Sequence, residues 1–188
     1  MKVKSVRLSH VLGVALVLAA VIVFLLLGTS SAAGQYPIDV VPKVNVESGG
    51  SLSITGGTTG ANTLDFASMG PGTTKEKTLT LGVTANNLWH LTVSKNQDLT
   101  YSVMSATVPS SNFTFKSNGG PGPIYVTSDT QFGNSGTPSN VVTNGSATGG
   151  SNVNVVYKLV IPGDQPCNDQ AFGYYSAVHT YTLVVGTP

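Results

Sequence analysis

Short runs in which apolar and polar residues alternate recur along this chain from residue 40 onward. Four of them are Lys77–Ala85, Leu88–Ser94, Asn152–Ile161 and Tyr174–Val185, and turn-forming residues separate them. Strict alternation is the period of a half-buried β-strand. No segment after residue 34 keeps a helical period for three turns. The pattern therefore predicts an all-β fold.

Gly and Pro clusters, such as Gly70-Pro71-Gly72, mark turns between these runs. Five further strands complete the prediction: Val40–Glu47, Ser51–Thr55, Thr63–Phe66, Asn112–Lys116 and Ile124–Thr127. Many short strands with turn signals and no helices predict a Greek-key β-sandwich of about eight or nine strands. We expect antiparallel sheets that are wet on one side.

The alternation also assigns faces to the predicted strands. The residues expected to point inward are Leu79, Leu81, Val83, Trp89, Leu91, Val93, Val153, Val155, Tyr157, Leu159 and Ile161. Those expected to point outward include Thr78, Thr80, Asn154 and Lys158. Phe132–Gly150 lacks this pattern and is rich in Gly, Ser, Thr and Asn. We expect a long polar loop there, which is either functional or mobile, or is a tolerated surface insertion.

The first 33 residues have the composition of a signal peptide. Lys2, Lys4 and Arg7 form a basic start, Val11–Leu27 is an unbroken apolar run, and small residues end at Ala33. Cleavage after Ala33 leaves residues 34–188 as one domain. The alternative is an uncleaved membrane anchor, because the apolar run is long for a signal and short for a membrane span.

The predicted mature chain carries six lysines, no arginine and eight acids, a net charge of −2. It offers no basic patch for nucleic acid. Cys167 is the one cysteine. An exported chain with one cysteine has no internal disulfide, so the thiol either stays free or pairs with another chain.

Motifs of catalysis are missing from the sequence. It has no Gly-x-Ser-x-Gly, His-Glu-x-x-His or phosphate-binding loop. Alternation puts His90 on the outer face and His179 on the inner face, which argues against a shared metal site. The oxygen-rich loop around Asp164 and Asp169 matches no calcium-loop spacing and is interpreted as a solvated turn. We therefore expect a non-catalytic protein without cofactor or metal.

The predicted strand Leu88–Ser94 contains Trp89-His90-Leu91, a Trp-x-Leu motif, and Tyr174–Val185 carries a second motif rich in Tyr and Thr. These two strands resemble the WxL family of bacterial surface domains, which is named for Trp-x-Leu. Its second motif is Tyr, three residues, Leu-Thr-Trp-Thr-Leu, three residues and Pro. Here Tyr175, Thr180, Thr182 and Leu183 match, His179 and Tyr181 replace Leu and Trp, and Pro188 comes one place late. The resemblance implies non-covalent attachment to the cell wall through peptidoglycan or other wall polysaccharide.

The layout also resembles exported subunits of extracellular fibres of the TasA-like and donor-strand pilin types. In such fibres an N-terminal segment adds a strand to a neighbour's open sheet edge. This resemblance implies that the partner is a second copy of the chain and that Gln35–Glu47 is the exchanged segment. A wall-associated surface protein is the first expectation, and a subunit of a filament or surface layer is the alternative.

A few residues are candidates for binding or modification. Trp89 and Tyr181 could stack on sugar rings, although alternation favours the core for both. Tyr174 is out of phase with Tyr175, so one of the two faces solvent, and Tyr174 is the better stacking candidate. Asn112-Phe113-Thr114 and Asn144-Gly145-Ser146 fit the glycosylation pattern.

Overall fold

The computed structural model describes residues 36–47, 49–60, 62–102, 106–163 and 174–186. The predicted signal segment, Cys167 and the Asp164–Asp169 loop lie outside these residues. The strands are β1 Tyr36–Val46, β2 Gly50–Gly56, β3 Leu64–Met69, β4 Thr74–Ala85, β5 Trp89–Lys95, β6 Leu99–Tyr101, β7 Thr107–Val108, β8 Phe113–Gly119, β9 Ile124–Tyr125, β10 Thr130–Gln131, β11 Ser139–Gly145, β12 Thr148–Val160 and β13 Tyr175–Val185. One 3₁₀ turn, η1, covers Ser110–Asn112. The all-β prediction is confirmed.

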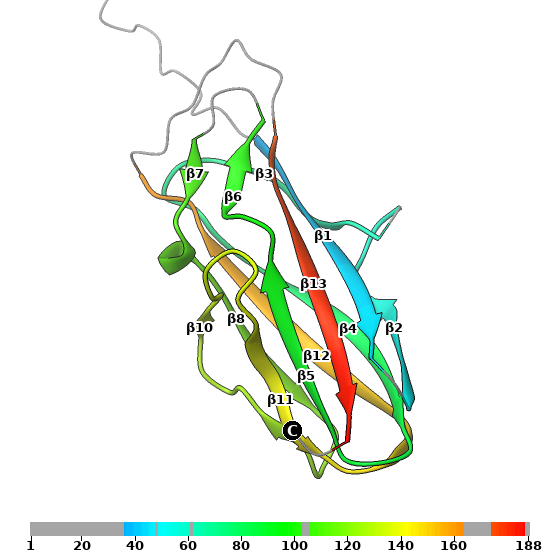
Figure 1. Cartoon of the computed structure of the whole chain (residues 1–188). Coiled ribbons are helices and arrows are strands. Elements are labelled where there is room, and N and C mark those ends of the chain that lie inside the picture. The colour runs from blue at the N-terminus through cyan, green and yellow to red at the C-terminus, as the bar shows by residue number, and fades with distance from the viewer. Residues whose placement is uncertain (1–35, 48, 61, 103–105, 164–173, 187–188) are drawn as a thin grey trace, which may run out of the picture. The chain divides into compact units, whose positions relative to one another are not determined.

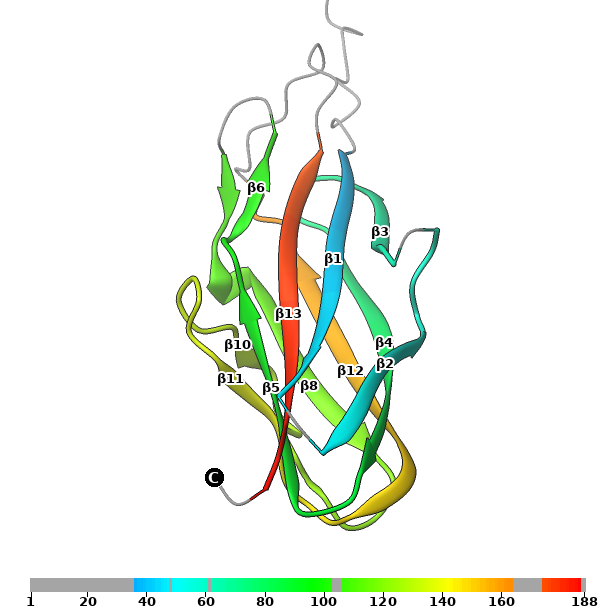
Figure 2. The same ribbon diagram turned by 45° about the vertical axis from the view of Figure 1, so that its right-hand side comes forward.

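The strands form two sheets that pack face to face as a sandwich (Figures 1 and 2). The first sheet has the order β3-β1-β13-β5-β11-β9, with β6 pairing with β13 and β7 with β6. The second has the order β10-β8-β12-β4-β2. Its longest ladder joins β12 to β4 from Thr148–Ala85 to Val160–Thr74.

The predicted polar loop at 132–150 is wrong in its middle. Residues 139–145 form β11, which pairs with β5 on one side and β9 on the other. Two adjacent valines, Val141 and Val142, are both fully buried there. A register shift lies between Asn140 and Val142, as expected of a bulge, which breaks the alternation by which a strand is recognised. Three shorter strands, β6, β7 and β10, were also not expected.

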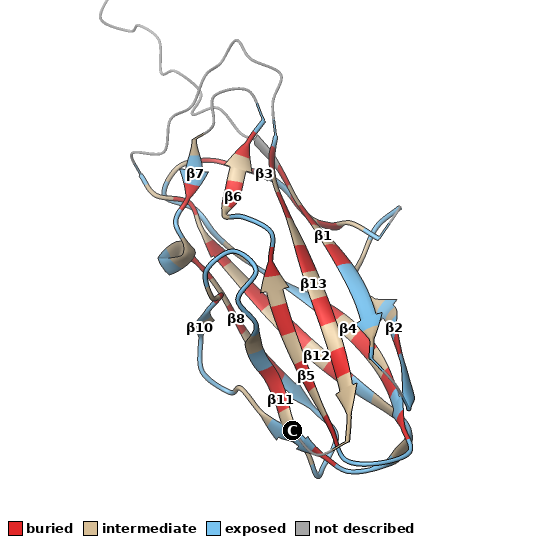
Figure 3. Ribbon diagram, in the orientation of Figure 1, coloured by how far each residue is buried: buried red, intermediate tan, exposed pale blue. Residues whose placement is uncertain are grey.

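Buried and partly exposed residues alternate along the central strands, as the faces were predicted (Figure 3). All eleven residues expected to point inward are at most 4% exposed. Each buried Leu, Ile or Val contributes roughly 1.5–3 kcal/mol. Among the described residues, no helix is long and apolar enough to span a membrane.

One ladder differs from the expected antiparallel pattern. The first strand, β1, pairs with the last, β13, in parallel, from Ile38–Tyr175 to Val46–Leu183. Parallel neighbours need a long connection between them, and here the connection is the rest of the domain. The first and last of the described strands therefore lie side by side within the first sheet.

Candidate assembly interface

The N-terminal strand β1 has partners on both sides along its first half. β3 pairs with it antiparallel from Tyr36 to Val40, and β13 pairs with it in parallel from Ile38 to Val46 (Figure 2). From Val41 to Val46, β13 is its one partner within the described ladders. That half of β1 is thus an open edge of the sheet.

The inward face of β1 covers the core beside β13. Ile38 and Val40 are 1% and 0% exposed, and Pro42, opposite His179, is also buried. Val44 lies in the same phase, opposite Tyr181, yet is 40% exposed. Burial of Ile38 and Val40 alone contributes about 3–6 kcal/mol. The inward face of β1 is therefore well buried from Ile38 to Pro42 and partly exposed at Val44.

Several features make β1 less firmly paired than the central strands. Pro37 and Pro42 have no N–H to donate, a property that confines proline to sheet edges and irregular positions. The ladder with β3 shifts register between Pro37 and Asp39. Asp39 also lies directly opposite Asp65. Burial and the Asp65 charge raise the pKa of Asp39, as expected when like charges face each other across strands.

The segment after β1 leaves the first sheet at once. The N–H of Glu47 donates to the carbonyl of Leu183 at 3.1 Å, and β2 begins at Gly50 in the second sheet. Gly49 has φ +68°, a conformation that costs glycine little. β1 is thus joined to the rest of the domain by a short link at one end.

Beneath β13, three polar side chains lie in the core and bridge the two sheets. The hydroxyl of Tyr157 on β12 is 3.1 Å from Nδ1 of His179 and 2.7 Å from the hydroxyl of Tyr181. The rings of Phe113 and Phe132 pack on His179 with centroid distances of 5.5 and 4.3 Å. Burial, with a smaller contribution from the Lys95 charge, lowers the pKa of His179 to about 3. The imidazole is therefore neutral at ordinary pH.

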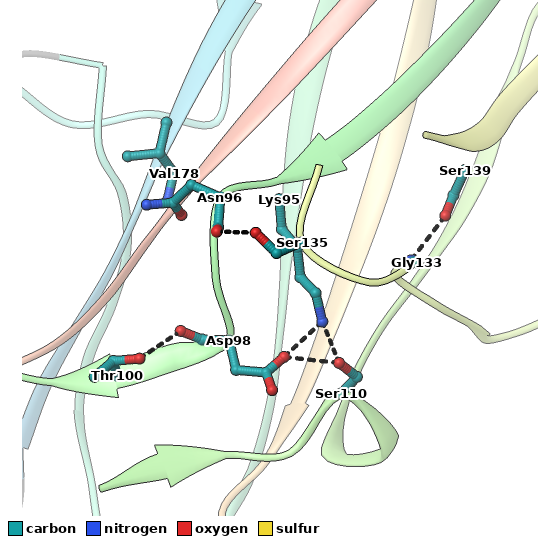
Figure 4. Close-up of polar contacts among 9 residues, drawn as sticks. All are labelled: Lys95, Asn96, Asp98, Thr100, Ser110, Gly133, Ser135, Ser139 and Val178. Carbon is teal, nitrogen blue, oxygen red and sulfur yellow. Dashed lines mark hydrogen bonds and ion pairs between the residues drawn. The ribbon is translucent and has the colours of Figure 1, made fainter. Parts of the chain in front are cut away.

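A second polar cluster, which the sequence analysis missed, closes the sandwich at the end of β5 (Figure 4). The Nζ of Lys95 lies 2.5 Å from Oδ1 of Asp98 and also bonds the hydroxyl of Ser110, which itself donates to Asp98 at 2.8 Å. Burial tends to raise the pKa of Asp98, but the hydrogen bonds from Lys95 and Ser110 and the lysine charge lower it overall. The Asp98 carboxylate thus binds both the Lys95 ammonium and the Ser110 hydroxyl.

Asn96 extends this cluster to β13 and to the loop before β11. Its side chain accepts from the N–H of Val178 at 2.7 Å, its own N–H donates to the Val178 carbonyl at 2.9 Å, and the hydroxyl of Ser135 bonds its carbonyl (Figure 4). The N–H of Gly136 donates to the carbonyl of Lys95 at 2.8 Å. These bonds connect the loop after β5 to the loop before β11 and hold β13 at Val178, the residue that pairs with Val41 of β1.

The two aromatic residues of the resembling motifs lie in the core, as alternation favoured. Trp89 and Tyr181 are 2% and 0% exposed, so neither presents a ring face to a ligand. Tyr174 is 48% exposed and Tyr175 is buried. The structure also confirms the opposite phases of His90 and His179. Among the described residues, no group of three His, Cys, Asp or Glu is placed to hold a metal ion.

The outer face of the second sheet carries a polar hollow of about 350 Å³. Its lining is uncharged and consists of Ser51, Ser53, Gly82, Val83, Thr84, Gly150, Ser151 and Asn152. Next to it, a hydrogen-bonded row crosses the sheet, in which Thr80 donates to Asn154 at 3.0 Å and Asn154 donates to Asn118 at 3.2 Å. Hydroxyl and amide groups of this kind suit a neutral, hydroxyl-rich ligand.

Comparison with known proteins adds no relative to this description. The sequence matches no protein-family model and no curated protein. The functional proposal therefore rests on the fold, on strand β1 beside β13 and on the polar hollow of the second sheet.

Proposed function

We propose that this chain is an exported structural subunit that joins copies of itself by exchanging strand β1. In the assembled form, β1 of one copy occupies the place between β3 and β13 of the next copy. The observation that carries the proposal is the position of β1, which is a terminal, parallel, half-open strand with a buried apolar face.

Exchange conserves the contacts that β1 makes within one chain. Ile38, Val40 and Pro42 would cover the same side chains of β13 in a neighbouring copy, so the free energy of their burial is retained. The link after Val46 leads away to the second sheet, so an exchanged strand connects two domains head to tail. Head-to-tail contacts that do not close into a ring produce filaments.

A disulfide test distinguishes exchange from a closed monomer. Val41 and Val178 are register partners on the outer side of β1 and β13. With Cys167→Ser as background, Val41→Cys with Val178→Cys forms a bond between chains if β1 is exchanged, and within one chain if it is not. Oxidised assemblies of the predicted mature chain then give a ladder of covalent oligomers on a non-reducing gel.

The matched control moves one cysteine out of register. Thr182 pairs with Asn45, four positions along β13 from Val178, which is about 13 Å of strand. Val41→Cys with Thr182→Cys is therefore too far apart to bridge. A protein that stays monomeric at all concentrations and salts, with only intrachain disulfide, would refute the exchange.

Association with wall polysaccharide is a second candidate, favoured by the uncharged hollow around Gly82. Binding there predicts that purified peptidoglycan retains the protein, and that Ser53→Ala with Asn152→Ala weakens retention several-fold. Asn140→Ala, at an exposed amide on β11 outside that hollow, is the control and leaves retention unchanged. Retention no greater than that of an unrelated β-sandwich would exclude this function.

A further inference from the structure

Two segments of the chain fit the pattern of an N-glycan acceptor, and they differ in how far their side chains are exposed. Asn112-Phe113-Thr114 lies where η1 passes into β8, and Asn144-Gly145-Ser146 lies where β11 turns toward β12. Transfer needs the Asn amide and the hydroxyl two residues later to reach an enzyme together, and the product has to fit the folded domain.

The first segment is built into the core. Asn112 is half-buried, its N–H donates to the Pro109 carbonyl at 2.9 Å, and its side chain accepts from Ser111 at 3.0 Å. Phe113 is 3% exposed and packs on the rings of Phe66, Phe132 and Tyr157. Thr114 pairs with strands on both sides. Presenting this segment to an enzyme would require extracting Phe113 and opening two ladders.

The second segment is held by its backbone and leaves its polar side chains free. Asn144 is exposed, has φ +51°, and bonds no other described residue through its amide. Gly145 lies against the Trp89 ring, and the carbonyl of Ser146 accepts from the indole Nε1 at 2.7 Å. Ser146 is itself exposed. The acceptor amide and the hydroxyl thus both lie on a surface turn anchored from below.

We infer that Asn144 carries an N-linked glycan and that Asn112 does not. In the reaction, the Nδ2 of Asn144 attacks the anomeric carbon of an oligosaccharide linked to a lipid through phosphate. The new bond is carbon to nitrogen, the anomeric carbon–oxygen bond breaks, the lipid phosphate leaves, and Nδ2 loses one proton to a base of the transferase. The inference needs export of the chain and does not depend on strand exchange.

A hollow beside this turn can accommodate the first sugar of the glycan. It measures about 240 Å³ and is lined by Leu88, Trp89, His90, Asn140, Thr143, Asn144 and Gly186. Leu88, one of these lining residues, is 46% exposed. The first sugar attached to Asn144 lies over this hollow, where its apolar ring face covers Leu88 and its hydroxyls meet the amide and hydroxyl lining.

The test is glycopeptide mass spectrometry of the full-length protein taken from the organism that produces it. Enzymatic release of N-glycans in heavy-oxygen water converts the modified Asn into a labelled Asp. Because the Asn144-Gly145 pair can also deamidate without an enzyme, a sample incubated without the enzyme is the control. We expect enzyme-dependent label and intact glycopeptides at Asn144, and neither at Asn112. Unmodified Asn144, or label at Asn112, would overturn the inference.

Matched variants separate the acceptor pattern from effects on folding. Ser146→Ala removes the hydroxyl but keeps the carbonyl that binds Trp89, so it abolishes the modification while the domain still folds. Ser146→Thr retains the modification, and Thr114→Ala changes nothing in glycan content. Continued modification of Asn144 in the Ser146→Ala variant would also refute the mechanism.

Discussion

The contact between Gly145 and Trp89 allows a quantitative prediction of stability. A Cβ at position 145 would lie 2.1 Å from Cε2 and 2.4 Å from Cδ2 of the Trp89 ring. The ring is 2% exposed and cannot move aside without disturbing the core, so Gly145→Ala overpacks it, at a cost of about 1–3 kcal/mol. The same shift strains the indole bond to Ser146, which is worth about 0.5–1.5 kcal/mol.

Together these effects predict that Gly145→Ala lowers the free energy of unfolding by about 1.5–4.5 kcal/mol. The measurement is urea denaturation followed by circular dichroism on dilute, monomeric protein. Gly149→Ala is the matched control, because a Cβ there meets no atom within 4 Å. We expect that variant to stay within about 0.5 kcal/mol of the parent.

A double-mutant cycle tests the cause of the loss. Trp89→Leu removes the whole ring that the new methyl group would strike, so Gly145→Ala costs at least about 1 kcal/mol less in that background. The reasoning is refuted if Gly145→Ala is as stable as the parent, or if its cost is the same with Leu at position 89.

Three further predictions concern buried and paired groups. The pKa of His179 is lowered to about 3 in the folded protein, so its contribution to the free energy of unfolding is fully present above pH 6.5 and is lost as the pH falls toward 3. In His179→Gln the free energy of unfolding therefore falls less steeply with acid, by up to about 1.4 kcal/mol per pH unit. Tyr157→Phe removes a hydroxyl bonded to both His179 and Tyr181 and lowers unfolding free energy by about 1–3 kcal/mol in urea titrations. The pKa of Asp39 is higher in the folded protein than in the unfolded chain. Its contribution to stability is therefore present below the unfolded-state pKa and is lost as the pH rises through the folded-state pKa. Asp39→Asn, which removes the repulsion from Asp65, is therefore more stable than the parent by a few tenths of a kcal/mol at pH 7 and equal to it at pH 3; equal stability at both would count against the repulsion.

The sequence was sufficient to predict the parts of the fold that local alternation encodes. The faces of β4, β5, β12 and β13 follow from a period of two residues, and so does the burial of Trp89 and Tyr181. Strand β11 was not predicted, because Val141 and Val142 are adjacent and both buried. Two adjacent buried residues break the alternation by which the other strands were recognised.

The candidate interface was only partly predictable. The N-terminal segment was expected to be the exchanged strand on grounds of resemblance alone. Pro42 within an apolar run is a local signal of an edge strand that the prediction did not use. The parallel pairing with β13 had no local signal, because its partners lie at opposite ends of the domain. The Lys95 cluster was missed for the same reason: Ser110 and Ser135 are polar residues among many, and folding brings them to one lysine.

The pairing of the first strand with the last also orders events in time. Ile38 and Tyr175 are 137 positions apart, so during synthesis at about 5–20 residues per second β1 is made roughly 7–27 seconds before its partner. Throughout that interval the apolar stripe of β1 has no β13 of its own to cover. In the proposed exchange, a completed neighbour with a vacant place beside its last strand could capture β1 during this interval. The rate of chain growth, together with affinity, would then set how often a copy closes on itself.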